Sequence, residues 1–374
     1  MVMFMVMVGF GIIIPVLPFY AEQLGASPLE LGLLMAVYSL MQFFFSPMWG
    51  RISDRIGRKP VIVTGILGLA VSYFLLAFST EVWMLFIARI VGGILSAANM
   101  PTVMAYVADI TTEEDRGKGM GVVGAATGLG FIFGPAIGGV FTNISLHAPF
   151  YIAGILSFIT LFFVMFILKE SLTESQKAQS SKPKNQSFID AVRGPFATLY
   201  FLQFFITLSL AGLEATFAYY GAAKAGLDAV NLGYIFMIMG LASAAVQGNM
   251  GKLTKKFGEG QIIKAGIFLS ILGFGLILFI QNFITAAIFL AIFGVGNGVI
   301  RPSVSSLLTK KSKYGHGSVT GYLSSFDSLG RIIGPVLGGF LFSISIELPY
   351  LAGILLSFLA LFLFAGQERK RSRG

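Results

Sequence analysis

The stretch GLGFIFGPAIGG at residues 128–139 recurs 200 residues later as SLGRIIGPVLGG at 328–339. A second pair of segments repeats at the same offset, PFYIAGILSFITLFF at 149–163 and PYLAGILLSFLALFL at 349–363. At an offset of 201, GRISDRIGRK at 50–59 matches GKLTKKFGEG at 251–260. Together the three pairs indicate an internal duplication, in which each half of the chain forms one structural unit in the same orientation.

The composition indicates a membrane protein. Hydrophobic residues make up 56% of the 374 residues and charged residues 11%, and the mean hydropathy is +0.84, a balance that soluble globular proteins do not reach. A helix needs about 20 apolar residues to cross the hydrocarbon. Twelve such runs are found, at residues 1–20, 30–49, 61–79, 83–107, 120–143, 149–168, 196–221, 231–250, 261–280, 284–308, 318–342 and 348–366. The sequence therefore predicts an all-α membrane protein with twelve transmembrane helices in two pseudo-symmetric six-helix bundles.

A polar segment divides the two halves. Residues 169–188 read KESLTESQKAQSSKPKNQSF, a composition typical of flexible linkers. The sequence thus predicts an N-terminal six-helix bundle over 1–168, a cytoplasmic linker over 169–195, a C-terminal six-helix bundle over 196–366 and a basic cytoplasmic tail over 367–374. We expect the first apolar run to be a retained span, because neither a charged leader nor a small-residue cleavage site accompanies it.

The basic residues lie on one side of the predicted membrane. The net charge is +9, and 22 of the 26 Lys and Arg fall in alternate connections and in the C-terminal tail. The opposite connections contain only Lys224, and Arg89, Arg301 and Arg331 lie inside predicted spans. By the positive-inside rule, the linker and both termini are cytoplasmic. The charge therefore indicates membrane orientation, and no nucleic-acid partner is predicted.

The composition excludes several kinds of chemistry. The chain has no cysteine and only two histidines, His147 and His316, neither of which makes a metal cluster. Disulfides, thiol nucleophiles and thiolate metal sites are therefore impossible, and no metal site is predicted. There is also no buried Ser–His pair and no glycine-rich phosphate loop. An intramembrane enzyme or a non-transporting receptor is thus the weakest alternative.

One glutamate lies inside an apolar run. Glu214 stands in SLAGLEATFAYYG, residues 209–221, where an ionised carboxylate at the bilayer centre costs about 2.5–3.5 kcal/mol. Because an apolar medium favours the protonated carboxyl, we expect Glu214 to bind a proton from one side and to release it when water or a cation arrives. Phe217, Tyr219 and Tyr220 supply aromatic faces for a cation. The alternative is a structural glutamate paired with a buried arginine.

A comparison of the two halves shows charged residues within predicted spans of the second half that have no charged counterpart in the first. At the offset of 200, uncharged residues stand opposite Glu214, Asp327 and Arg331. Asp327 and Arg331 are four residues apart and so share a helix face, which favours an ion pair between them. The alternative is a proton-sensitive Asp327 that exchanges between Arg331 and Arg301. Either way, we expect the chemistry to lie where the halves differ.

The segment GRISDRIGRKP at 50–60 resembles the signature loop between spans two and three of the major facilitator superfamily. The residues that carry the resemblance are Gly50, Asp54, Arg55, Gly57, Arg58 and Lys59. We expect the two glycines to permit a tight turn, and Asp54 to accept hydrogen bonds from an arginine and to lie against a helix N-terminus. The candidate donors are Arg55, Arg58 and Arg116. Such a cluster would latch the halves on the cytoplasmic side.

Three further segments narrow the resemblance to export. RIVGGILSAANMP at 89–101 and GFGIIIPVLPFY at 9–20 resemble the fourth-span and first-span motifs of drug:proton antiporters with twelve spans, the NorA/Bmr-like multidrug efflux transporters. GLGFIFGPAIGG is similar to their span-five antiporter motif, through Gly130, Gly134, Pro135, Gly138 and Gly139. Small residues let helices approach closely, and proline allows a kink. The resemblance therefore implies a close helix pair between the halves that seals against proton leak.

The same resemblance assigns roles inside the membrane. In NorA- and Bmr-like exporters a glutamate of the seventh span is tied to proton coupling, a role that falls here on Glu214. Those exporters carry an acid in span ten before an Ile-Arg-Pro triplet, whereas this stretch reads GNGVIRP, with Asn297 and Gly298 at that place. Asp327 is the candidate substitute. The substrate cavity is expected to involve Gln42, Arg89, Phe131, Phe217 and Arg301.

The function implied by the resemblance is proton-driven export of hydrophobic and cationic drugs. Examples are dyes, quaternary ammonium compounds and fluoroquinolone- or tetracycline-like antibiotics. The expected mechanism is rocker-switch alternating access by a monomer in the bacterial cytoplasmic membrane. The expected partners are small amphipathic substrates, protons and the lipid bilayer, and a proton gradient takes the place of a cofactor. The alternative, a proton-coupled importer of a small polar metabolite, predicts a more polar cavity and no span-five antiporter motif.

Overall fold

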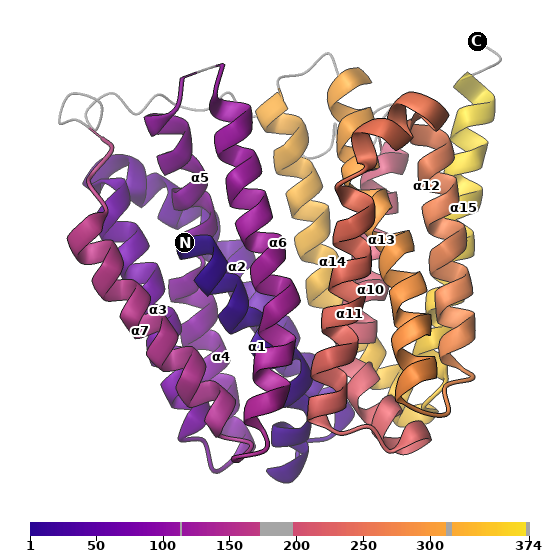
Figure 1. The fold of residues 1–374 in the computed structure, drawn as a ribbon, viewed down its shortest axis with the longest axis horizontal. Helices are drawn as coiled ribbons and strands as arrows, with labels where there is room; N and C mark the ends of the chain where they lie inside the picture. The colour runs from indigo at the N-terminus through magenta and orange to yellow at the C-terminus, as the bar shows by residue number, and fades with distance from the viewer. Residues whose placement is uncertain (113, 173–196, 312–315, 372–374) are drawn as a thin grey trace. The chain divides into compact units, whose positions relative to one another are not determined.

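The computed structural model describes residues 1–112, 114–172, 197–311 and 316–371, with backbone alone for 116–117, 309–311, 316–320 and 367–371. The described residues form helices and no strand (Figure 1). The first half contains α1 (Val2–Gln23), α2 (Pro28–Ile56), α3 (Arg58–Ala77), α4 (Val82–Ser96), α5 (Asn99–Ile110), α6 (Arg116–Phe141) and α7 (Ala148–Ile167). The second half contains α10 (Ala197–Ala225), α11 (Ala229–Gln247), α12 (Met250–Ile277), α13 (Phe283–Lys311), α14 (His316–Ile344) and α15 (Leu348–Arg371).

The prediction of twelve spans is confirmed. Twelve helical segments are long and apolar enough to cross a membrane, with α4 and α5 counted together as Val82–Ile110. Helices are expected here because a helix satisfies its own backbone hydrogen bonds where no water is present. The short break between α4 and α5 lies just before Pro101. A proline has no N–H to donate and its ring crowds the carbonyl four residues earlier, here that of Ala97.

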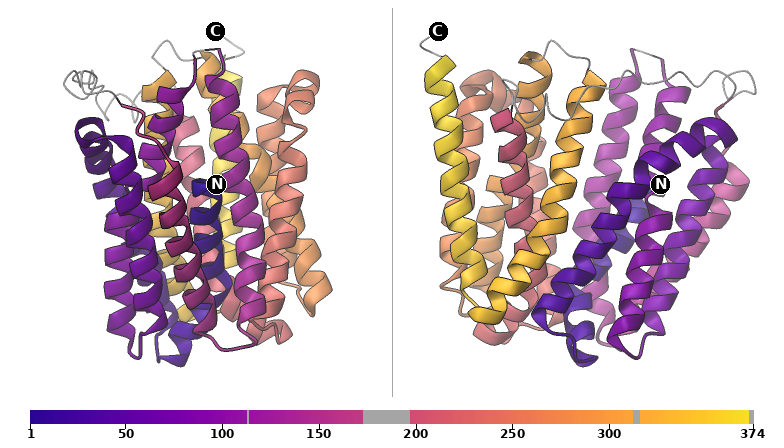
Figure 2. Two further views of the ribbon diagram at one scale, coloured as in Figure 1. Left: turned by 60° about the vertical axis from the view of Figure 1, so that its left-hand side comes forward. Right: turned by 180° about the vertical axis from the view of Figure 1, so that it is seen from behind.

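Two compact units are formed. Of the described residues, the first unit takes those of Met1–Ser27, Val37–Pro183 and Leu232–Met237, and the second takes those of Pro28–Ala36, Lys184–Asn231 and Ile238–Gly374. In the first unit α1 packs against α6 and α7, and α3 packs against α4 and α7. In the second unit α10 packs against α14 and α15, and α12 packs against α13 and α15. Each packing partner in one unit has its counterpart in the other, and Figure 2 shows that the helices within each unit run alongside one another.

Glycines let α6 approach α1 closely in the first unit. Gly130, Gly134 and Gly138 are spaced four residues apart and so share one helix face. A Cβ added at Gly134 would lie 2.7 Å from the carbonyl oxygen of Val8, and one at Gly138 would lie 2.6 Å from that of Ile12. No side chain fits at these positions, so the two backbones touch.

The second unit repeats this contact between α14 and α10. A Cβ at Gly330 would lie 2.9 Å from the backbone nitrogen of Leu208, and one at Gly338 would lie 3.0 Å from the Cα of Gly212. The early residues of α2 also pack in this unit, where a Cβ at Gly32 would collide with the carbonyl of Pro335. The glycine and proline pattern that marks the repeat in the sequence is thus a pattern of close helix contacts.

Candidate functional site

Glu214 lies inside the second unit, on α10. It is 2% exposed, and its Oε2 lies 3.7 Å from Nη1 of Arg331 on α14. Its other carboxylate oxygen, Oε1, is buried and has no hydrogen-bond partner among the described residues. A buried polar atom without a partner is costly, and more so when it carries charge. The carboxylate of Glu214 therefore has one cationic neighbour, Arg331, near the upper limit of ion-pair distance. One of its two oxygens has no hydrogen-bond donor among the described residues.

Asp327, on α14, has a different environment. Thr207 Oγ1 and Gln203 Nε2 donate hydrogen bonds to its Oδ1 at 2.5 Å and 2.8 Å. Arg301 of α13 places Nη2 3.0 Å from its Oδ2. Both oxygens of the carboxylate are thus satisfied, one by neutral donors and one by a guanidinium. Hydrogen bonds and an opposite charge both favour the ionised form of a carboxyl group.

The two acids therefore pair with different arginines. The interpretation of Asp327 and Arg331 as an ion pair with each other is wrong: Arg331 faces Glu214, and Asp327 pairs with Arg301. Sharing a helix face brings two side chains near each other, but partners on neighbouring helices decide which charges meet. The proposed exchange of Asp327 between two arginines remains a prediction.

Sequence reasoning missed the two neutral donors on α10. Gln203 and Thr207 are 1% and 3% exposed, and Gln203 also donates to Thr207 at 3.1 Å. A signal for them existed, because they precede Glu214 by eleven and seven residues and so fall on its side of the helix. Their counterparts at the offset of 200 are Met3 and Met7, so the comparison of halves would also have found them.

The aromatic residues that follow Glu214 are inside the second unit. Phe217 and Tyr220 are each 0% exposed, and the ring of Tyr220 lies 4.4 Å from that of Tyr350 between centroids. The predicted role of Phe217 in a substrate cavity stays a prediction. In this structure the side chain is fully buried in the second unit, three residues after Glu214 on α10.

A second cluster lies in the first unit, around Arg89. The guanidinium carbon lies 4.1 Å from the ring centroid of Tyr38 on α2, and Arg89 is 3% exposed. The Tyr38 hydroxyl lies 2.8 Å from Ser96 Oγ, and Gln42 Nε2 donates to that tyrosine hydroxyl at 3.1 Å. A cation over a desolvated aromatic face is stabilised by about 2 kcal/mol. Arg89 and Gln42 are thus connected through one tyrosine that the sequence analysis did not single out.

Phe131 joins the same cluster through Phe10. The rings of Phe131 and Phe10 are stacked with centroids 6.4 Å apart, and Phe10 lies 6.2 Å from the ring of Tyr38. Three of the predicted cavity residues, Gln42, Arg89 and Phe131, therefore belong to one contact network in the first unit. It offers aromatic faces, hydroxyls and an amide, a set suited to an amphipathic molecule.

The signature loop contains a charge network centred on Arg58. Its Nη1 lies 2.5 Å from Oδ1 of Asp54, and its Nε lies 3.0 Å from Oδ2 of Asp109 at the end of α5. Gly57 has a φ of 110°, a conformation that only glycine adopts readily. The expectation that Gly50 also forms the turn is wrong, because α2 continues through it to Ile56.

Of the candidate donors to Asp54 whose side chains the structure describes, Arg58 forms the ion pair. Arg55 is exposed, and the side chain of Arg116 lies outside the described residues. Sequence reasoning missed Glu170, whose carboxylate accepts from the backbone N–H groups of Arg58 and Lys59 at 2.9 Å and 3.1 Å. Glu170 thus caps α3 from a position 112 residues away along the chain. Partial burial alone would raise the pKa of Glu170, but backbone hydrogen bonds hold it below its usual value.

The antiporter motif makes two kinds of contact in the first unit. Gly130, Gly134 and Gly138 face α1, as described above, and not another half of the chain. The backbone of Pro135 and Gly139 faces Gly233 on α11, whose added Cβ would lie 2.5 Å from the Pro135 carbonyl oxygen and 3.1 Å from the Gly139 Cα. The expected contact with the second half of the sequence therefore involves the proline and the last glycine of the motif.

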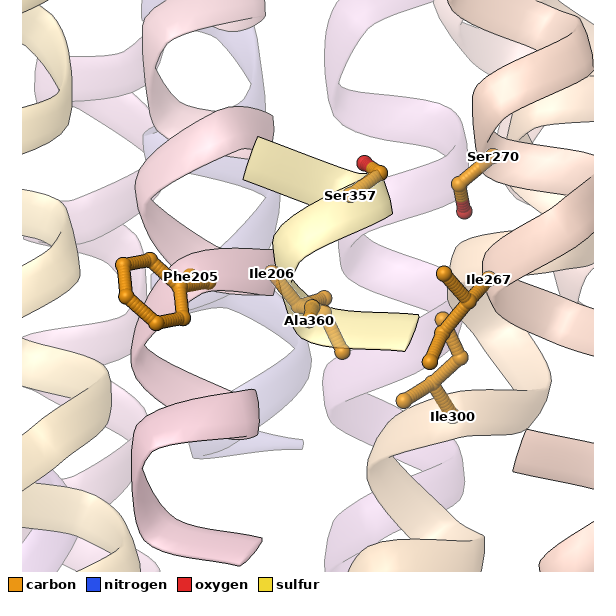
Figure 3. Close-up of a pocket in the computed structure, with 7 residues that line it drawn as sticks. All are labelled: Phe205, Ile206, Ile267, Ser270, Ile300, Ser357 and Ala360. Atoms are coloured by element: carbon orange, nitrogen blue, oxygen red, sulfur yellow. The ribbon is translucent and has the colours of Figure 1, made fainter. Parts of the chain in front are cut away.

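A small pocket lies elsewhere in the second unit. It is lined by Phe205, Ile206, Ile267, Ser270, Ile300, Ser357 and Ala360, as Figure 3 shows. Its volume of about 10 Å³ is close to the minimum that a single water molecule needs. None of the predicted site residues lines it. Among the described residues there is also no group of three or more His, Asp or Glu that could hold a metal ion.

Comparison with known families identifies the chain. The family model of the Major Facilitator Superfamily matches residues 1–322. The chain belongs to this superfamily. A member of this superfamily is a membrane transporter and not an enzyme, and this agrees with the twelve spans and the duplicated helix packing.

Curated relatives of this superfamily member include proteins of Bacillus subtilis and Staphylococcus aureus. It is 33% identical over 354 residues to Multidrug resistance protein 2 of Bacillus subtilis, an alignment that covers 93% of this chain and 88% of that protein. It is 34% identical over 356 residues to Multidrug resistance protein 1 of the same organism, covering 93% and 90%. It is 29% identical over 371 residues to the quinolone resistance protein NorA of Staphylococcus aureus, covering 98% and 95%.

Solved structures share the fold of this superfamily member. The nucleoside transporter NupG matches with a TM-score of 0.79 at 15% identity, over 98% of this chain and 97% of that one. A bacterial homologue of the human lysosomal transporter Spinster matches with a TM-score of 0.82 at 13% identity, over 98% of this chain and 95% of that one. These matches show the fold alone, since the identities are low.

Proposed function

We propose that this superfamily member is a proton-coupled multidrug efflux antiporter of the bacterial cytoplasmic membrane. Its relatives of about 30% identity are named for multidrug and quinolone resistance and align over almost the whole chain. The substrates are hydrophobic and cationic drugs, including dyes, quaternary ammonium compounds and fluoroquinolone- or tetracycline-like antibiotics. Transport follows rocker-switch alternating access, in a monomer whose termini are both cytoplasmic.

The observation that carries the proposal is the environment of Glu214. Its carboxylate is buried, its Oε1 has no hydrogen-bond partner among the described residues, and its cationic neighbour, Arg331, is 3.7 Å away. In such a site a proton or a substrate cation can neutralise the carboxylate, but the two compete for the same charge. A carboxylate that accepts one or the other exchanges them, and this is the requirement for antiport.

Asp327 has a supporting role in this mechanism. Because Gln203, Thr207 and Arg301 together satisfy both of its oxygens, it remains ionised while Glu214 gains and loses a proton. A fixed negative charge beside Arg301 keeps that arginine in place. Glu214 is thus the principal proton carrier. Asp327 contributes to coupling because its negative charge neutralises Arg301 throughout the transport cycle.

The cluster around Arg89 provides binding surface in the first unit. Tyr38, Phe10 and Phe131 offer aromatic faces, and Gln42 offers an amide. Aromatic faces and a few polar groups bind many flat, apolar cations without demanding one shape. A polar metabolite would need more hydrogen-bond donors and acceptors than this cluster provides, so the importer alternative is less supported.

The test compares wild type with Glu214→Gln in inverted membrane vesicles energised by a proton gradient. We expect wild type to move a cationic dye and to release protons in exchange, and the variant to lose both activities. Dye binding to the purified variant should persist, because the cluster around Arg89 is intact. If wild type moves no cationic dye, but an acidic lumen drives a preloaded polar solute out of the vesicles together with protons, the importer alternative is correct.

A matched control separates coupling from general damage. Glu22→Gln removes a carboxylate from an exposed position at the end of α1, and we expect it to keep dye transport and proton exchange at the wild-type level. Equal loss in both variants at equal expression would contradict the special role of Glu214.

A further inference from the structure

The signature loop has a structural counterpart in the second unit. Gly57 and Gly258 are equivalent at the offset of 201, and their backbones have nearly the same conformation, with φ and ψ of 110° and 160° at Gly57 and 76° and 153° at Gly258. Gly258 lies at a kink between the first turns of α12 and the rest of that helix, as Gly57 lies directly before α3. Figure 1 shows α12 bending near its start, at the end of the unit where α15 ends. The duplication has thus kept the backbone of this turn.

The charges around the two turns are opposite. In the first unit Asp54 and Asp109 neutralise Arg58, and Glu170 caps the next helix. In the second unit the equivalent of Asp54 is Lys255, and the equivalent of Arg58 is Glu259. By sequence, Lys310 stands at the place of Asp109 at the offset of 201, and Lys370 stands at the place of Glu170 at the offset of 200 that holds for the last helix of each half. The side chains of both lysines lie outside the described residues. The acids that neutralise the first turn have therefore all become lysines in the second.

Three lysines are exposed on the first two turns of α12. Lys252, Lys255 and Lys256 are all exposed, and none of them forms an ion pair with a carboxylate in the part of the chain that the structure describes. The ammonium of Lys256 lies 5.2 Å from the ring centroid of Phe257. Within the described residues Glu259, the nearest carboxylate along the chain, accepts a hydrogen bond from Ser306 and forms no ion pair with these three lysines. An anion from outside the protein can therefore bind to them.

The opposite face of the segment attaches it to the second unit. Met250 and Leu253 pack against the hydrophobic core formed by α10, α12, α13, α14 and α15. Phe257 is 47% exposed, and further along α12 Phe268 and Leu272 are 60% and 41% exposed. The segment therefore has lysines at one level and exposed apolar side chains on the span that follows. This arrangement matches a phospholipid, which has an anionic headgroup above an apolar chain.

We propose that Lys252, Lys255 and Lys256 form a binding site for the phosphate of an anionic phospholipid. A basic cluster beside a transmembrane helix attracts anionic headgroups electrostatically. The exposed Phe257, Phe268 and Leu272 lie along the acyl chains of the same lipid. The site is independent of Glu214 and of the proposed transport function. Its lysines differ from Arg58 of the first unit, whose charge is neutralised by Asp54 and Asp109.

The test measures lipid binding by native mass spectrometry of the purified full-length chain, titrated with phosphatidylglycerol or with phosphatidylcholine. We expect wild type to retain phosphatidylglycerol preferentially, and K255Q/K256Q to bind it about thirtyfold more weakly, since each lysine near an anionic surface contributes about 1 kcal/mol. The variant K255R/K256R should bind as wild type does, which shows that the charge and not the fold is responsible.

The control is K59Q/K118Q, which removes two positive charges from the corresponding connections of the first half. We expect it to bind phosphatidylglycerol as wild type does, because Lys118 already pairs with Asp115 and Lys59 lies beside the carboxylate of Glu170, which accepts from its backbone N–H. Equal weakening in both double variants would overturn the proposal and leave a nonspecific charge effect. Displacement of the lipid by inorganic phosphate at equal concentration would also overturn it, in favour of a soluble anion.

Discussion

Asp327 and Glu214 are two carboxylates of the second unit that differ in their hydrogen bonds. Both oxygens of Asp327 have partners, whereas one oxygen of Glu214 has none among the described residues. We predict that Asp327→Asn transports more slowly but keeps the wild-type ratio of protons to drug, because its charge is held by Arg301 and does not titrate during transport. Losing the charge-assisted bonds should lower the free energy of unfolding by about 1–3 kcal/mol. The ratio is measured from the reversal potential of transport in proteoliposomes.

The double variant Asp327→Asn/Arg301→Gln provides the control for this prediction. If the aspartate acts as the counter-charge of Arg301, removing both partners should recover part of the lost stability, as expected for residues in direct contact. A changed proton-to-drug ratio in the single variant would instead assign a transported proton to Asp327.

Helix contacts depend on the spacing of glycines as well as on their number. We predict that Gly134→Ala destabilises the protein by about 1–3 kcal/mol, because the new Cβ would lie 2.7 Å from the Val8 carbonyl oxygen and would push α1 and α6 apart. Gly128→Ala, on the same helix, is the matched control, since nothing lies within 4 Å of its added Cβ. Thermal unfolding in detergent should separate the two variants, and equal melting temperatures would refute the close contact.

The capping of α3 by Glu170 predicts a dependence on pH. Backbone hydrogen bonds hold the pKa of Glu170 below its usual value of 4.5, against the opposing effect of burial. Its charged form is therefore stabilised by folding, so its contribution is present above pH 4.5 and is lost as the pH falls below that value. We expect Glu170→Gln to be less stable at pH 7 by about 1 kcal/mol.

The measurement is the melting temperature of both proteins between pH 7 and pH 4. The gap between wild type and Glu170→Gln should narrow as the pH falls, because protonation removes the same charge as the substitution. A gap that stays constant over this range would show that the carboxylate does not cap α3 in its ionised form.

The elements could be predicted from sequence more completely than the contacts. Hydropathy located all twelve spans, but it placed the end of the second span at 49 and the start of the ninth at 261, whereas α2 ends at Ile56 and α12 begins at Met250. Hydropathy marks where a helix leaves the lipid, and a helix with charged turns continues beyond that point.

The side-chain contacts of the signature loop could not be predicted from spacing. The pairing of Arg58 with Asp54 and the capping of α3 by Glu170 depend on side chains that folding brings together.

At the scale of the whole molecule, the orientation in the membrane remains to be tested. The chain contains no cysteine, so single cysteines can be introduced without a background. We predict that a cysteine replacing Thr80 reacts with a membrane-impermeant maleimide in intact cells, and that one replacing Lys118 reacts only in inverted vesicles. The reverse pattern would place both termini outside and would contradict the positive-inside assignment.

The membership of residues 28–36 in the second unit has a consequence for biosynthesis. Gly32 packs against Pro335, a residue that the ribosome adds 303 positions later. At about 5–20 residues per second, this delay lasts roughly 15–60 s. During that time the start of α2 is already in the membrane while its partner has not been translated. The nascent first half thus leaves the start of α2 without its packing partner, and quality-control proteases have their best opportunity before α14 arrives.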